Sequence, residues 1–336
     1  MKKYLPDNRG IALILVLMII SIIVVVTLDF HTDMRSELTA AANVRDGIML
    51  RYLAKSGFNL AMAILAKDAE DDENPCDTLR EYWANTEAVS AVSSILPNSE
   101  GLRITMDISD FSAKIQINSL VTENGGFNDL QKTTLERFLN LPEFELDEDT
   151  VRSMVDSIKD WIDADDDETD FGAENSYYQA QDTPYACENG PIQAISSIRK
   201  VKGFVDIPQE IFDKIADQLT TYGDGKININ TADLPVLQSL SDGITPALAE
   251  DIITHRQNET NDLCASSWYK DMPGMNVEQI PPDLITLKSS FFEISSAATV
   301  DVQQGAISLT KYVKGVVNRL EKDGKKRIDL IYWQID

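Results

Sequence analysis

The chain opens with a short charged segment that runs directly into a long stretch without charge. The 18 residues from Ile11 to Leu28 carry no charged side chain, and only Ser21 and Thr27 bring hydroxyl groups into the run. An apolar stretch of this length can cross a membrane as a helix. The sequence therefore predicts an N-terminal helix that a membrane can cover, so the rest of the chain does not have to bury it.

The boundaries of this stretch separate three interpretations. A secretory signal peptide would end in a small-residue cleavage site, and the sequence DFHTDMRSE after Leu28 contains none. A plain signal anchor remains an alternative. The third is a prepilin-type N-terminus, because RG followed by IALILVL resembles the site where prepilin peptidase cuts. Cleavage would then fall between Gly10 and Ile11, Ile11 would be N-methylated, and the basic leader 1–10 would stay in the cytoplasm.

Leu15 is a departure within this resemblance. Most pilins and pseudopilins carry glutamate at the fifth residue after the cleavage site, which is Leu15 here. A buried charge in a bilayer costs about 2.5 kcal/mol or more at the helix centre, so it is usually kept for a reason. In pilins that reason is pairing with the terminal amine of a neighbouring subunit. A chain without this glutamate is expected either to fail to assemble or to lack a neighbour on that side, as a tip subunit does.

Composition favours an exported, folded and acidic protein. Apolar residues make up 43% of the 336 residues, and the net charge of −25 becomes about −27 once the leader is removed. Such acidity disfavours nucleic acid as a partner, because phosphate binding needs lysine and arginine. Three cysteines allow one disulfide, in any of three pairings, in an oxidising compartment. Two histidines and no CxxC motif disfavour zinc.

Periodicity predicts one long helix and a sheet formed from both ends of the chain. Apolar residues recur at helical spacing through 29–68, which would continue the apolar helix to about 55 residues; a membrane anchor followed by a separate amphipathic helix is the alternative. Alternating patterns predict two short strands within 102–118 and three strands at 291–302, 306–320 and 326–335. The middle, from 121 to 290, shows short helical segments separated by Gly, Pro and Asp. We therefore expect an α+β fold in which an all-α domain interrupts an antiparallel sheet.

The sharpest local feature is an acidic loop with the sequence DWIDADDDETDFGAENSYY at 160–178. So many carboxylates repel one another unless a cation neutralises them, and calcium takes six to eight oxygen ligands from such loops. The spacing is similar to that of an EF-hand loop but lacks the glycine at position 6. The alternative is a solvated acidic loop without metal. The expected calcium ligands are Asp163, Asp165, Asp167, Asp170 and Glu174.

A second feature, KININTADLPVLQSLSDGITPALAEDIITHR at 226–256, resembles a helix-hairpin-helix turn. Such turns often present backbone N–H groups to phosphate, but acidic residues surround this one. A helical scaffold without nucleic acid is therefore the favoured interpretation. Asn228, Asn230 and Asp233 are expected to cap helices or to offer oxygens to a second cation. No Ser/His/Asp or Cys/His arrangement is legible, so we expect no enzyme.

Several motifs, in order along most of the chain, resemble the K subunit of type II secretion systems, the largest minor pseudopilin. They are RGIALILVL, LAKSGFNLAMAIL, FSAKIQINSL, DWIDADDD with GAENSYY, PYACENGPIQAISSIRKVKGF and KININTAD. The resemblance implies a pilin-type helix and sheet with an inserted α-domain that is SAM-like or helix-hairpin-helix-like, and calcium in that domain. The implied segments are leader 1–10, transmembrane 11–28, amphipathic helix 29–68, first sheet part 69–120, insertion halves 121–223 and 224–290, and last strands 291–336.

The same resemblance implies partners, a location and a disulfide. Its partners would be the I and J, then the H, minor pseudopilins and prepilin peptidase. The chain would span the bacterial inner membrane once through residues 11–28, with its bulk periplasmic, and cap the pseudopilus tip and help initiate its assembly. A membrane-anchored periplasmic enzyme or solute-binding domain is the alternative. Family cysteines at the position of Ala113 and near Leu219 are missing, so the expected pair is Cys187 with Cys264.

Overall fold

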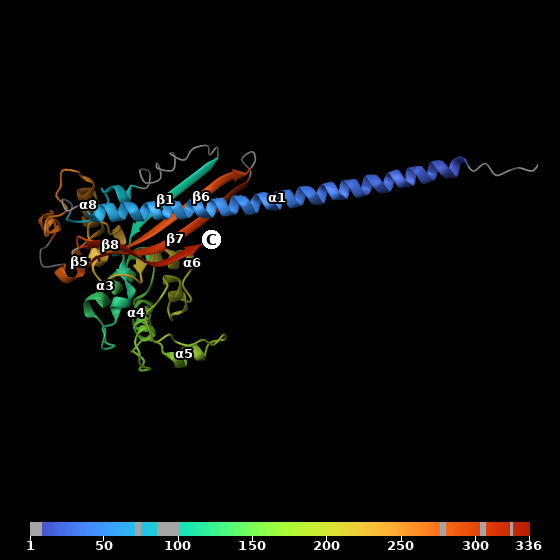
Figure 1. Cartoon of the computed structure of the whole chain (residues 1–336). Coiled ribbons are helices and arrows are strands. Elements are labelled where there is room, and N and C mark those ends of the chain that lie inside the picture. Colours follow the sequence, from blue (N-terminus) through green and yellow to red (C-terminus); the bar gives the residue numbers. More distant parts are fainter. Residues whose placement is uncertain (1–8, 71–74, 86–100, 276–279, 303–306, 323–324) are drawn as a thin grey trace, which may run out of the picture.

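A single helix dominates the N-terminal part of the computed structural model, which describes residues 9–70, 75–85, 101–275, 280–302, 307–322 and 325–336. Helix α1 runs unbroken from Arg9 to Glu70 over 62 residues, and its N-terminal half projects far from the rest of the molecule (Figure 1). The hydroxyls of Ser21 and Thr27 donate to the carbonyls four residues earlier, at 2.8 and 2.7 Å, so they need no other partner in an apolar surrounding.

The C-terminal half of α1 packs on a four-stranded antiparallel sheet. Strand β1 (Leu102–Asp110), β6 (Phe291–Val302), β7 (Ile307–Lys322) and β8 (Lys325–Ile335) lie in that order across the sheet. The buried helix residues fall on one face because they are three or four positions apart. They are Leu50, Ala54, Phe58, Ala61 and Leu65.

Gly57 lets this helix approach the sheet closely. A Cβ atom at Gly57 would collide with Ser296 Oγ on β6 and would lie 3.1 Å from Ile104 Cγ2 on β1. A larger residue would therefore push α1 away from the sheet. Strand β1, which precedes the middle region of the chain, lies beside β6, which follows that region (Figure 1).

Two strands lie within 102–118 as expected, but they belong to different sheets. Only β1 belongs to the main sheet, and it ends at Asp110, whose carboxylate accepts a hydrogen bond from the backbone N–H of Ser112 at 2.7 Å. This bond closes a 3-10 turn over Phe111–Ala113 that turns the chain out of the sheet. The next extended residues, β2 (Ile115–Gln116), pair instead with β3 (Leu219–Thr220) inside the insertion.

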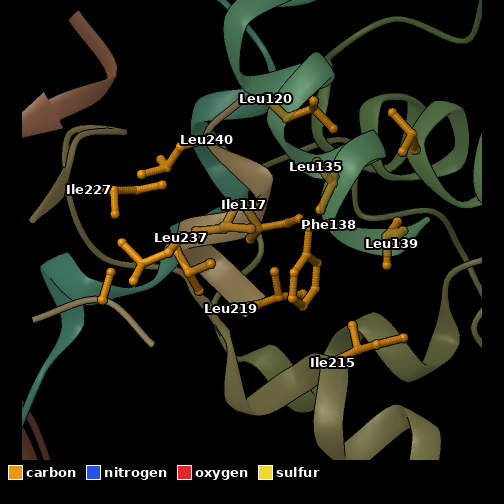
Figure 2. Packing of buried hydrophobic residues seen from close by; sticks show 14 of the residues in the cluster. Ile117, Leu120, Leu135, Phe138, Leu139, Ile215, Leu219, Ile227, Leu237 and Leu240 are labelled. Carbon is orange, nitrogen blue, oxygen red and sulfur yellow. The ribbon is translucent and has the colours of Figure 1, made fainter. Parts of the chain in front are cut away.

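The insertion between β1 and β6 is a mainly helical domain with one core. Its helices and short strands are α3 (Asp129–Leu139), α4 (Glu148–Ile162), α5 (Asn175–Gln179), α6 (Gln209–Asp217), α7 (Leu234–Ser239), α8 (Pro246–Gln257), β2, β3, β4 (Ile227–Asn228) and β5 (Ile285–Thr286). Figure 2 shows Leu135 and Phe138 of α3 beside Leu219 of β3, with Leu237 of α7 close by. Both halves of the insertion therefore bury one continuous cluster rather than two.

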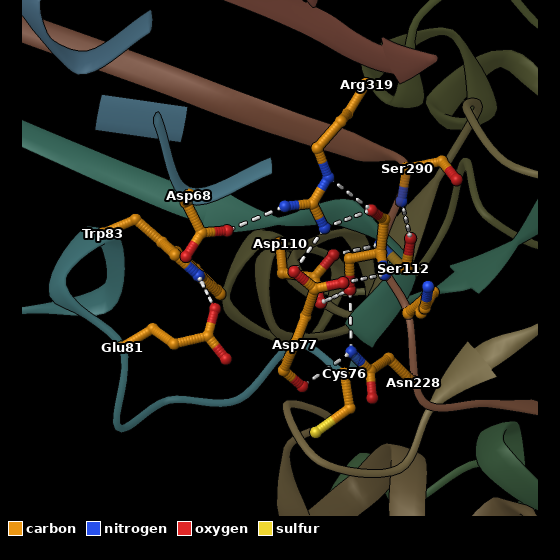
Figure 3. A network of polar contacts seen from close by, with 12 residues as sticks. Asp68, Cys76, Asp77, Glu81, Trp83, Asp110, Ser112, Asn228, Ser290 and Arg319 are labelled. Carbon is orange, nitrogen blue, oxygen red and sulfur yellow. Dashed lines mark hydrogen bonds and ion pairs between the residues drawn. The ribbon is translucent and has the colours of Figure 1, made fainter. Parts of the chain in front are cut away.

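A buried polar network joins this domain to the helix and the sheet (Figure 3). Arg319 of β7 forms ion pairs with Asp68, near the end of α1, at 2.8 Å and with Asp77. Asn228 of β4 donates to the carbonyl oxygen of Asp77 at 3.2 Å and to the hydroxyl of Ser289 at 2.7 Å. Because α1, the sheet and the insertion all contribute to this network, the domain is held at the C-terminal end of α1.

The disulfide also lies at this junction, and the expected pairing of Cys187 with Cys264 is wrong. Cys76 is bonded to Cys264 across 188 residues of sequence. The chain after α1 folds back over the loop that follows α8, where the Arg80 guanidinium donates to the carbonyls of Arg256, Asn258 and Asn261 at 2.6, 2.6 and 2.9 Å. This return brings Cys76 to Cys264. The thiol of Cys187 instead points to the carbonyl of Asp160, at 3.6 Å.

Candidate metal centre

Three buried carboxylates meet where α4 ends. Asp160 lies in the last turn of α4, Asp163 directly follows the helix, and Glu174 directly precedes α5. Asp160 and Asp163 are three residues apart and therefore share one face of the helix. One carboxylate oxygen from each of the three residues lies within 4.8 Å of the others, and each residue is at most 3% exposed.

The acidic loop returns to α4 because its backbone binds the carboxylates of that helix. The Asp160 carboxylate accepts the backbone N–H of Thr169 at 3.1 Å and also its hydroxyl, and Asp156 accepts the N–H of Phe171 at 3.2 Å. Gly172 then passes so close that a Cβ there would lie 1.9 Å from Asp160 Oδ2. The glycine is required at this point because no side chain fits between the loop and α4.

The charges of this cluster are poorly compensated by protein groups. Neither carboxylate oxygen of Glu174 has a hydrogen-bond partner, nor does Asp163 Oδ1, although all three atoms are buried. Lys159 supplies one positive charge through its ion pairs with Asp163 and, at 3.5 Å, with Asp160. Burial, followed by the negative charges of Asp160 and Asp163, raises the pKa of Glu174 to about 7. Buried carboxylates of this kind are normally paired or bound to a metal.

The chemistry of these donors fits a hard divalent cation. Calcium prefers carboxylate and carbonyl oxygens over nitrogen or sulfur, and three converging carboxylates with unpartnered oxygens offer that surface. A cation would also remove the repulsion that raises the pKa of Glu174. The residues present therefore fit the calcium ion expected from the sequence.

The structure brings together two of the five expected ligands. Asp163 and Glu174 belong to the cluster, whereas Asp165, Asp167 and Asp170 are exposed and lie outside it. The Asp165 carboxylate instead accepts the backbone N–H of Asp167 at 2.9 Å, which shapes the loop.

Asp160 was missed by the sequence reasoning. Its spacing of three residues before Asp163, at the end of an amphipathic helix, is the signal that could have identified it. The spacing of residues on the helix decides which carboxylates converge. The number of carboxylates in the loop that follows does not.

The asparagines of the second motif have structural partners. Asn230 donates to the carbonyl of Leu263 at 3.2 Å and accepts the indole N–H of Trp268 at 2.9 Å, while Asn228 belongs to the junction network described above. Asp233 precedes α7 as an exposed N-cap residue without a side-chain capping bond. Thus both asparagines hold the insertion together with their amide groups.

The expected cleavage site lies at the free end of α1. Gly10 and Ile11 are exposed on the first turn, and most of the leader, residues 1–8, lies outside the described residues. Leu15 is 54% exposed, as are its neighbours to a similar extent, and the first buried residue of the helix is Leu50. Helix α1 is long and apolar enough to cross a membrane.

Comparisons with known proteins agree with this architecture. Two family models, both described as type II secretion system protein K, match residues 113–223 and 227–279. The putative type II secretion system protein K of Escherichia coli K12 is 25% identical over 88% of this chain and 91% of its own length. The Aeromonas hydrophila type II secretion system protein K is 26% identical over 93% of this chain and 94% of its own.

A solved structure shares the fold. The GspK–GspI–GspJ complex from enterotoxigenic Escherichia coli contains a chain with a TM-score of 0.68 and 18% identity, covering 88% of this chain and 99% of that chain. At this level of identity the likeness bears on the fold alone. It agrees with the α+β arrangement of a long apolar helix, an antiparallel sheet and an inserted helical domain.

Proposed function

Because this chain belongs to the protein K family of type II secretion systems, we propose that it is a minor pseudopilin that caps the tip of the pseudopilus and helps initiate its assembly. The observation that carries this proposal is the position of the insertion. Asn228 of the helical domain donates hydrogen bonds to the carbonyl of Asp77 and to the hydroxyl of Ser289. Arg319 of β7 pairs with both Asp77 and Asp68, so this network holds the domain at the C-terminal end of α1, opposite the exposed apolar end. Neighbouring subunits can pack along the exposed apolar end of α1. The inserted domain occupies the opposite end of the helix, where a further subunit would otherwise be added.

The apolar end of α1 supports the same proposal. The first 18 residues after Gly10 are exposed on all sides, so a bilayer or neighbouring helices must cover them. Leu15 occupies the position where most pilins and pseudopilins carry a glutamate that pairs with the terminal amine of a neighbouring subunit. A subunit at the end of the filament does not need this glutamate. We propose that prepilin peptidase cuts between Gly10 and Ile11 and that Ile11 becomes N-methylated. Mass spectrometry of the purified protein should then find a chain that starts at Ile11; a chain that retains the leader would refute the processing.

The partners proposed for this subunit are the I and J minor pseudopilins, and then the H subunit, with the chain held in the inner membrane and its bulk in the periplasm. The full-length protein in detergent should co-purify with the I and J subunits of its own system as a complex of defined stoichiometry. A chain that stays monomeric beside both at micromolar concentration would refute the proposal. A melting temperature that responds to small metabolites would favour the alternative of a solute-binding domain.

We further propose that Asp160, Asp163 and Glu174 hold a calcium ion that stabilises the insertion. Their buried oxygens without partners support this proposal, because a cation would satisfy them. The ion would neutralise the carboxylates, and the residues would in turn fix the loop between α4 and α5. No catalytic step is involved.

Chelation tests the calcium proposal. Removing calcium should lower the melting temperature, and added calcium should restore it at about 0.1–1 mM if the affinity is that of extracellular modules. The Glu174→Gln variant should lose most of this response, whereas Asp170→Asn, at an exposed position outside the cluster, should keep it. An unchanged melting curve in chelator would refute the assignment.

A further inference from the structure

The outer edge of the sheet exposes an unusual run of large apolar side chains. Strand β8 is the last strand of the sheet, and in the described part of the chain no other strand pairs with its outer edge. Leu330, Ile331, Tyr332 and Trp333 follow one another on this strand and are 45%, 50%, 48% and 43% exposed. Proteins usually protect such edges with charges, prolines or covering segments, because an open edge pairs readily with another chain.

A groove lies beside this edge, between the sheet and the inserted domain. The register of β8 against β7 skips Ile331, because Val316 faces Tyr332 and Val317 faces Leu330. Ile331 and Tyr332 consequently both border the groove, which has a volume of about 550 Å³. Its other walls include the rings of Phe111 and Tyr222, at the start and middle of the insertion, together with the ion pair of Lys314 and Glu293. A bulge that redirects side chains in this way is typical of binding sites.

The charge of these strands differs from that of the chain as a whole. The residues of β7 and β8 include seven lysines and arginines but two acidic residues, Glu321 and Asp329, in a chain whose net charge is −25. Lys326 and Arg327 begin the exposed part of β8, where Arg327 already forms an ion pair with Asp329 at 2.5 Å. An acidic strand would find opposite charge here, and such complementarity favours encounter and register.

We propose that the free edge of β8 and the adjacent groove bind an extended segment of a different protein chain, which adds to the sheet as a fifth strand. The segment would carry apolar side chains for the groove and acidic residues opposite Lys326 and Arg327. Main-chain hydrogen bonds supply the affinity in this mode of binding, and side chains in the pocket supply specificity. The inference rests on the proposed function in one respect, since it assigns this segment to another subunit of the tip complex.

The position of β8 in the molecule suits a neighbouring subunit. Its C-terminal end lies on the side of the body from which α1 projects (Figure 1), and Trp333 lies beside Phe58 and Lys55 of α1. A subunit whose own helix runs along α1 would therefore meet the edge of β8 directly. The inserted domain borders the groove beside β8 through Ala194 and Ile195.

Hydrogen exchange on the full-length protein tests the proposal. The backbone amides of β8 should exchange about tenfold or more slowly when the co-purified I and J subunits are bound. Ile331→Glu should weaken that complex by about tenfold or more, because it places a charge in the groove. Reversing the charges with Lys326→Glu and Arg327→Glu should weaken it by about tenfold at low salt and by less at high salt.

Val205→Glu is the matched control, because Val205 is an equally exposed apolar residue (47%) in a loop of the inserted domain. It should change the affinity by less than about twofold. The complex could form while the β8 amides stay unprotected and Ile331→Glu binds like the wild type. That result would refute the role of β8 but would leave the proposed tip complex standing. Absence of any wild-type complex refutes the proposed function and this inference together. Protection of β8 in the isolated chain at high concentration would show that a second copy is the occupant, which also overturns the proposal.

Discussion

Breaking the bond between Cys76 and Cys264 should destabilise the protein substantially. The bond closes a loop of 188 residues, and the loss of chain entropy in the unfolded state then amounts to about 18 cal/mol/K, or ~5 kcal/mol at 25 °C. Removal of native disulfides usually costs about 2–5 kcal/mol, so this figure is an upper value. The hydrogen bonds of Arg80 to the loop after α8 hold the same segment independently and will retain part of the native contact.

The assay is thermal and denaturant unfolding of the full-length protein in detergent, with the wild type, Cys76→Ser, Cys264→Ser and the double variant. The two single variants should lose equal stability, with a fall in melting temperature on the order of 10 °C. The double variant should be no worse, because each change breaks the same bond. Reductant should lower the melting temperature of the wild type to that of the variants.

Cys187→Ser is the control in this series. Its thiol makes one weak hydrogen bond to the carbonyl of Asp160, so the change should cost less than about 1 kcal/mol. A large loss in Cys187→Ser together with a neutral Cys76→Ser would refute both the pairing and the reasoning from loop length. Peptide mapping without reductant would then identify the bond that is actually present.

Two further predictions concern buried carboxylates. Burial raises the pKa of Asp110 to about 6, so the folded state keeps a proton between pH 4 and 6 that the unfolded state releases; stability should therefore fall by on the order of 3 kcal/mol as pH rises through this window. Asp110→Asn should flatten that slope in denaturant titrations, and an unchanged slope would contradict the assignment. Gly172→Ala should cost about 1–3 kcal/mol in unfolding experiments and weaken the calcium response, because its Cβ would collide with Asp160. Gly190→Ala, whose Cβ would lie 3.6 Å from the nearest atom, should cost little, and equal effects of the two changes would refute the steric argument.

The local patterns of the sequence were sufficient for most of the secondary structure. The uncharged run from Ile11 to Leu28 predicted a helix regardless of its surroundings, because an apolar stretch of that length has few alternatives. The last strands were located to within a few residues, since alternation is an intrinsic property of a half-buried strand. Strand patterns on both sides of a helical middle region indicated the interrupted sheet, and the resemblance of ordered motifs to protein K implied the same arrangement.

The candidate site was predicted in part. Asp163 and Glu174 were identified because dense carboxylates near a turn indicate a cation. Asp160 was not predicted, although it belongs to the cluster. Asp165, Asp167 and Asp170 were predicted as ligands but lie outside the cluster. The composition of the loop gives the number of available oxygens, but the geometry of α4 decides which of them are buried together.

The sequence by itself predicted the long apolar helix, the mixed fold and the family, because each depends on residues close together in the chain or on motifs in order. Only the tertiary structure decided the contacts between distant segments. Cys76 meets Cys264 because the chain after α1 folds back over the loop after α8, and Arg319 joins Asp68 to Asp77 because β7 lies beside the end of α1. Such pairings are set by how the packed elements lie relative to one another, and spacing along the chain carries no record of that arrangement.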